Sequence, residues 1–137
     1  MTGNARPAPD LDAAMVLGMA STAIPFARSR EAQAERWLRI LRLHGRAGAA
    51  LQALGVSEAP LEDHPHDEPA QPAGGDPVAE VGEGAARAAE DRGAPAVGTA
   101  DVLVAVMDVY GTDFDEVLRA HGTDRAEVLA RLELQAA

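Results

Sequence analysis

The sequence contains no cysteine and very few aromatic residues. Only 3% of its 137 residues are aromatic, whereas 47% are hydrophobic, and most of these are Ala, Leu and Val. The lack of cysteine excludes a disulfide framework and thiolate metal sites, and it is compatible with a reducing compartment. An apolar composition dominated by Ala and Leu favours helices over sheets. We therefore expect an all-α fold.

Basic residues are also scarce. The chain has 12 Lys and Arg against 22 Asp and Glu, so its formal net charge is −10. A surface of this sign repels a phosphate backbone, which argues against nucleic acid as a partner and favours cationic peptides or basic proteins. No signal peptide pattern opens the chain, and no apolar run approaches the roughly 18 residues that span a bilayer. We expect a soluble, cytoplasmic protein that has no membrane partner.

Apolar residues recur at helical spacing along most of the chain. Asp10 and the pair Asp76-Pro77 are typical of helix starts, and Gly55 is typical of a helix end. Pro25 is expected to kink or end the first helix, and Trp37 to lie at the centre of the first half. The predicted helices cover residues 11–28, 31–43, 47–54, 77–91, 99–109, 113–120 and 124–134.

One stretch has almost no large apolar residues. Residues 57–77 are rich in Pro, Gly and acids, so they cannot bury enough surface to offset the entropy of ordering. We predict a flexible N-terminus (1–9), a first helical repeat (10–56), an acidic linker (57–76) and a second repeat (77–137). His64 and His66 lie among acids within the linker and are potential metal ligands. A solvated loop is the preferred interpretation, and we expect neither metal nor cofactor.

The two halves of the chain resemble each other. Val16, Ala20, Ala23, Leu38 and Leu41 each have an apolar counterpart 65 residues later, and Leu51 and Gly55 match Leu118 and Gly122 at an offset of 67. A length change in a surface loop explains the shift. The sequence predicts about seven helices in tandem repeats, packed around a pseudo-twofold axis because neither repeat can bury its own apolar face.

These repeats resemble the N-terminal domain of the Clp/Hsp100 unfoldases, especially the ClpC type. In repeat one the resemblance rests on "AAMVLGMASTA", "AERWLRIL" and "ALQALGV". In repeat two it rests on "VAEVGEGAARAAEDRG", "VGTADVLVAVM" and "VLRAHGTDRAEVLARL". Prolines stand where the fourth helix of repeat one belongs, and the chain has no Walker A pattern. The resemblance implies a standalone recognition domain without an ATPase motor.

The resemblance also implies a set of ligand-binding residues. In the ClpC type a Gly-Thr-Glu-His step helps to hold phosphoarginine. Glu35 retains the acid in repeat one, whereas repeat two keeps Thr99 but has Ala100 at the acid position. Asp10 replaces part of the family's Phe-Thr opening, and its charge would repel phosphate. The alternative for Glu35 is a solvated acid near a helix N-terminus, where the helix dipole favours it.

A peptide groove is a second possible site. Met15 and Met19 are candidates to line it, because Met-rich surfaces adapt to varied apolar ligands such as the cyclic peptide antibiotics that bind this family. The alternative places both Met residues in the core. Asp101, which follows Thr99 on the predicted helix, completes the candidate set, although the dipole also favours an acid in a first helical turn.

Taken together, these patterns predict a peptide-binding or protein-binding module that performs no chemistry. It would serve as an adaptor for a Clp protease component or as a decoy for a cyclic peptide. One alternative is a structural or oligomerisation protein in a specialised biosynthetic pathway. The other is a small acid/base enzyme built around Asp101, Asp108 and His121. Other enzyme classes are disfavoured, because the chain has neither a G-x-S-x-G elbow nor a complete dinucleotide loop.

Overall fold

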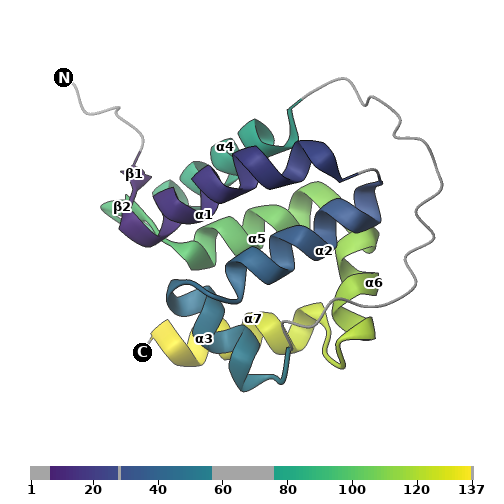
Figure 1. Ribbon diagram of the computed structural model, residues 1–137. Coiled ribbons are helices and arrows are strands. Elements are labelled where there is room, and N and C mark those ends of the chain that lie inside the picture. The colour runs from purple at the N-terminus through teal and green to yellow at the C-terminus, as the bar shows by residue number, and fades with distance from the viewer. Residues whose placement is uncertain (1–6, 28, 57–75, 137) are drawn as a thin grey trace.

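The computed structural model describes residues 7–27, 29–56 and 76–136. Its elements are β1 (Ala8–Pro9), α1 (Leu11–Ala23), the 3-10 turn η1 (Ile24–Phe26), α2 (Arg30–Leu41), α3 (Gly45–Ala53), α4 (Pro77–Asp91), β2 (Ala96–Val97), α5 (Thr99–Tyr110), α6 (Thr112–Ala120) and α7 (Arg125–Ala136). Within these ranges the prediction of an all-α fold with about seven helices is confirmed (Figure 1). The predicted linker falls almost wholly outside the described residues.

Local capping explains where several helices begin and end. The Asp10 carboxylate accepts a hydrogen bond from the backbone N–H of Ala13, and Asp76 accepts from Val78 and Ala79. The first helix is shorter than predicted, because α1 ends before Pro25 and continues as the 3-10 turn. The other predicted boundaries agree with the structure to within about two residues, which is the usual precision of a helix end.

A pair of two-residue strands was not predicted. β1 and β2 pair in parallel, with Ala8 opposite Ala96 and Pro9 opposite Val97. The backbone N–H of Asp10 then donates to the carbonyl of Val97 over 2.8 Å. This short pair ties the start of α1 to the start of α5, although the two lie far apart in the sequence (Figure 1).

The short helices α3 and α6 end in the same way. After α3, Gly55 takes a φ of 87° and the N–H of Val56 donates to Leu51; after α6, Gly122 takes a φ of 91° and Thr123 donates to Leu118. Both hydrogen bonds are 3.0 Å long, and a left-handed glycine suits each position. The starts of α2 and α5 fit less well, since their caps, Ser29 and Gly98, do not follow the offset of 65.

The repeats pack across each other and share one core. α3 packs against α5 of the second repeat, and α6 packs against α2 of the first. α7 covers α3, and α4 lies along α5 (Figure 1). Trp37, Leu38 and Leu103 are fully buried in this core, which draws on all seven α-helices. The prediction that Trp37 lies at the centre of its half is confirmed.

Hydrogen bonds between polar side chains join the repeats inside this core. The indole N–H of Trp37 donates to the hydroxyl of Tyr110 over 3.1 Å, and that hydroxyl donates to Gln33 over 2.8 Å. The guanidinium of Arg30 lies 4.9 Å from the Tyr110 ring centre. These directional contacts fix the relative position of α2 and α5, which apolar packing alone specifies less tightly.

No helix among the described residues is long and apolar enough to cross a membrane.

Candidate functional site

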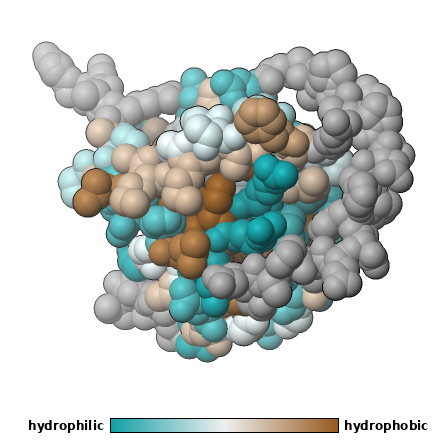
Figure 2. Space-filling view, in the orientation of Figure 1, coloured by the Kyte–Doolittle hydropathy of each residue, from teal (hydrophilic) through white to brown (hydrophobic). Residues whose placement is uncertain are grey.

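A groove lies between α1 and α2 on the described surface. Met19 and Ala23 of α1, Arg36, Arg39 and Ile40 of α2, and Leu43 just beyond α2 line it. Its volume is about 610 Å³, within the range of sites that hold small molecules or peptide side chains. Figure 2 shows brown, apolar atoms between α1 and α2, with teal, polar atoms directly beside them. We call this feature the α1–α2 groove.

Both candidate methionines are exposed on α1. Met15 and Met19 are 46% and 42% exposed, so the alternative that placed them in the core is wrong. Leu11, Met15 and Met19 follow one another at four-residue spacing, which puts them on one side of α1. Met19 lines the groove itself, and Met15 lies one turn away.

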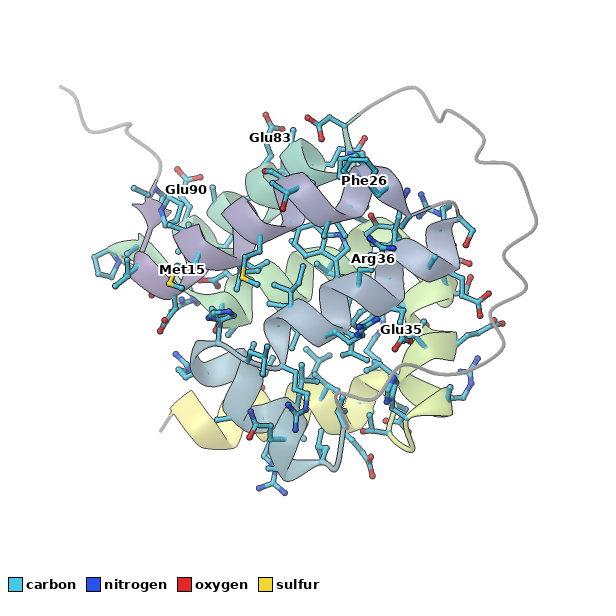
Figure 3. The ribbon with its side chains drawn as sticks, in the orientation of Figure 1. Met15, Phe26, Glu35, Arg36, Glu83 and Glu90 are labelled. Carbon is cyan, nitrogen blue, oxygen red and sulfur yellow. The ribbon has the colours of Figure 1, made fainter. Side chains whose placement is uncertain are left out.

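The groove is locally basic although the chain is acidic. Arg36 reaches from α2 to α1, where its Nη1 donates to the carbonyl of Ala23 over 2.9 Å (Figure 3). This contact satisfies a carbonyl at the end of α1 and holds the guanidinium at the groove wall. Arg39 lines the groove one turn further along α2, so two guanidinium groups border one apolar floor.

The candidates Asp10, Thr99 and Asp101 come together at the start of α5, and all three have structural partners. Asp101 is buried, accepts from the N–H of Gly98 over 2.9 Å and forms two hydrogen bonds with Arg92. These bonds raise the pKa of Arg92 further above its ordinary value. The Thr99 hydroxyl accepts from the N–H of Ala47 over 3.0 Å, which joins α3 to α5. Asp10 caps α1.

Glu35 lies apart from these residues. Its carboxylate is 3% exposed and 3.2 Å from Nε2 of His121, whose side chain is equally buried. The interpretation of Glu35 as a solvated acid is therefore wrong. Its second oxygen, Oε1, has no hydrogen-bond partner in the described part of the chain. Glu35 faces the end of α6, whereas the adjacent Arg36 faces α1, so the two are directed to different parts of the molecule (Figure 3).

The residues of the enzyme alternative do not form one site. Asp101 pairs with Arg92, His121 pairs with Glu35, and Asp108 is exposed on α5. General acid/base catalysis requires such groups within hydrogen-bond reach of one reacting atom. Among residues 7–27, 29–56 and 76–136, no cluster of His and acidic residues forms a potential metal site. His64 and His66 lie outside the described residues.

The sequence interpretation missed the wall of the groove that α2 forms. Arg36, Arg39, Ile40 and Leu43 recur at spacings of three and four on α2 and just beyond it. That spacing was available in the sequence as a continuous stripe. The arginines resembled an ordinary solvated face, and only the packing of α1 beside α2 makes the stripe one wall of a groove.

Comparisons with known proteins add no relative. No protein family matches the chain, and neither a curated protein nor a solved structure matches it.

Proposed function

We propose that this chain is a non-enzymatic peptide-binding module and that peptides bind in the α1–α2 groove. The observation that carries the proposal is the exposure of Met19 in a groove of about 610 Å³. Methionine is flexible and polarizable, so it adapts to apolar side chains of different shape. Exposed apolar residues beside a concave surface are typical of binding sites.

Two roles suit a module of this kind. The resemblance of the two repeats to the ClpC-type recognition domain supports an adaptor that presents peptides to a Clp protease component. It equally supports a decoy that sequesters a peptide ligand such as a cyclic antibiotic. Both roles require peptide binding without chemistry, so both depend on the same groove.

Selection from a library of short random displayed peptides tests the proposal. We expect enrichment on the wild-type protein and none on the variant Met19→Glu, which puts a charge at the groove without altering the core. Leu129→Glu is the matched control, because Leu129 is a similarly exposed apolar residue on α7. Equal enrichment on the wild type and Met19→Glu would contradict the groove as the binding site.

Nuclear magnetic resonance of methionine methyl groups then locates the bound peptide. Met15 and Met19 are exposed, whereas Met107 is buried in α5 and serves as an internal reference. We expect an enriched peptide to shift the Met19 signal and to leave Met107 in place. A peptide that shifts Met107 but not Met19 would place binding elsewhere.

A second candidate function is self-association through the exposed apolar residues of α1 and of the 3-10 turn that follows it. Leu11 and Phe26 are 76% and 74% exposed, the highest values among the large apolar residues of the described chain. Burial of such side chains between copies would be favourable. Light scattering over a range of concentrations tests this: a rising mass that Phe26→Ser lowers supports it, and a constant monomer mass excludes it.

A further inference from the structure

The two arginines of the α1–α2 groove differ from the paired arginines elsewhere. Arg30, Arg92 and Arg125 each form an ion pair with an aspartate. Within the described residues, Arg36 and Arg39 have no carboxylate partner. Arg36 makes one hydrogen bond to a backbone carbonyl, which leaves its other N–H groups to the groove.

The acidic residues of the neighbouring helix do not neutralise this site. Glu83 and Glu90 lie at the outer edge of α4, beyond α1 from the groove in Figure 3. The carboxylate nearest in sequence, Glu35, is buried against His121 on another side of α2. The groove is therefore a cationic, partly apolar site on a protein whose net charge is −10.

The type of basic residue also indicates which ligand the groove suits. All 12 basic residues of the chain are arginine. A guanidinium presents a rigid planar fork of N–H donors, which matches the two oxygens of a carboxylate. Two such forks beside Met19, Ile40 and Leu43 suit a ligand that carries an apolar group and a carboxylate close together.

From this charge complementarity we propose that the α1–α2 groove selects peptides in which an apolar side chain lies next to a carboxylate. The apolar group packs on Met19 and Leu43, and the carboxylate accepts hydrogen bonds from Arg39 and Arg36. The inference rests on the peptide-binding function proposed above and names its ligand class. It reverses the expectation of cationic partners, because the local charge of the groove is opposite to the net charge.

A carboxylate of this kind has two sources, an acidic side chain or the C-terminus of a peptide. Four short fluorescein-labelled peptides distinguish them by anisotropy titration. One contains Leu-Glu with an amidated end, one ends in Leu with a free carboxylate, one contains Leu-Gln with an amidated end, and one contains Ala-Glu with an amidated end. We expect the first or the second to bind at least about fivefold more tightly than the third, since one partly exposed charge pair contributes about 1 kcal/mol. We expect the fourth to bind more weakly than the first wherever the first binds.

The variant Arg39→Gln tests the arginine directly. We expect it to weaken the binding of the carboxylate peptides by about fivefold and to leave the affinity for the Leu-Gln peptide unchanged. Arg87→Gln is the matched control, because Arg87 is exposed on α4, and it should leave all affinities unchanged. Raising the salt concentration should weaken the carboxylate peptides alone.

The possible failures are distinguishable. If the Leu-Glu, free-carboxylate and Leu-Gln peptides bind equally and Met19→Glu abolishes all three, the preference for a carboxylate is overturned and peptide binding stands. If no peptide binds and the Met19 methyl signal does not move, peptide binding in the groove is overturned as well. If the mass of the protein doubles while peptides fail to bind, a second copy of the chain occupies the groove, and the proposal is overturned.

Discussion

Glu35 shows how one buried side chain changes a functional expectation. The resemblance to the ClpC-type domain led us to expect that this residue helps to hold phosphoarginine. In the structure its carboxylate is 3% exposed and directed at His121 of the other repeat. A guanidinium from solution cannot reach an acid in that position without separating α2 from α6.

We therefore expect free phosphoarginine not to bind the folded protein. Trp37 lies two residues from Glu35 and is the only tryptophan, so its fluorescence reports on this part of α2. Titration with phosphoarginine should leave the emission unchanged, as should titration with arginine as the control. A saturable change with phosphoarginine alone, lost in Glu35→Gln, would support the phosphoarginine binding that the resemblance implies.

The buried hydroxyl of Tyr110 makes the stability of the fold depend on pH. Burial raises the pKa of its hydroxyl above the ordinary value of about 10, while the hydrogen bond from Trp37 and the charge of Arg30 partly oppose the rise. The folded state holds this proton more tightly than the unfolded state. Stability is therefore unaffected at pH values below the ordinary pKa of about 10 and falls as the pH rises above it.

Tyr110 is the only tyrosine, so its titration can be followed by the ultraviolet absorbance of tyrosinate. We expect a higher midpoint in the folded protein than in urea, and a still higher one in Arg30→Gln, where the nearby positive charge is absent. A midpoint equal to that in urea would contradict the buried position of the hydroxyl.

At the scale of elements, the first residue of α3 is a glycine on which two demands act. Gly45 has a φ of 62°, and a Cβ at that position would lie 2.5 Å from the Thr99 hydroxyl, the group that accepts from Ala47. Gly55 has a φ of 87° but open space around it. The two positions therefore separate backbone strain from steric overlap.

We expect Gly55→Ala to lower the free energy of unfolding by about 1 kcal/mol, the cost of a left-handed residue with a side chain. Gly45→Ala should cost more, since the added methyl group also displaces Thr99 from the N-terminus of α3. Urea denaturation of the two variants measures the difference. Equal losses would mean that the contact between α3 and α5 adjusts freely.

The helices were largely predictable because their signals are local. Asp10 and Asp76 cap the helices that follow them, and Pro25 ends the regular part of α1. The two-residue strands β1 and β2 were not predictable, since they are too short to show an alternating pattern and pair across a long stretch of chain. Sequence periodicity detects elements that bury a face along their own length.

The candidate site was less predictable because it depends on contacts between distant residues. Met19 was identified by its residue type, but Arg36 and Arg39 become part of a groove only because α1 packs beside α2. Glu35 is buried because His121, 86 positions later, approaches it. The stripe on α2 is a local pattern, but the sequence does not show that α1 packs beside it or that His121 buries Glu35.

At the scale of the whole molecule, the shared core makes each repeat depend on the other. Trp37 of the first repeat is completely buried and donates to Tyr110 of the second. Alone, the first half would expose the apolar face of α2, and the second half would expose that of α5. So small a chain buries too little surface to offset its ordering entropy. We therefore expect fragments 1–56 and 76–137 to show little helix separately and to regain it when mixed.

Circular dichroism measures the helix content, and a blue shift of the Trp37 emission reports its burial at the interface. The control is a second fragment with Val106→Asp, which places a charge in the fully buried core and should prevent assembly. A cooperative thermal transition of fragment 76–137 alone would contradict the mutual dependence of the repeats. It would show instead that α4 to α7 bury enough of one another to fold, with the first repeat docking onto a surface already formed.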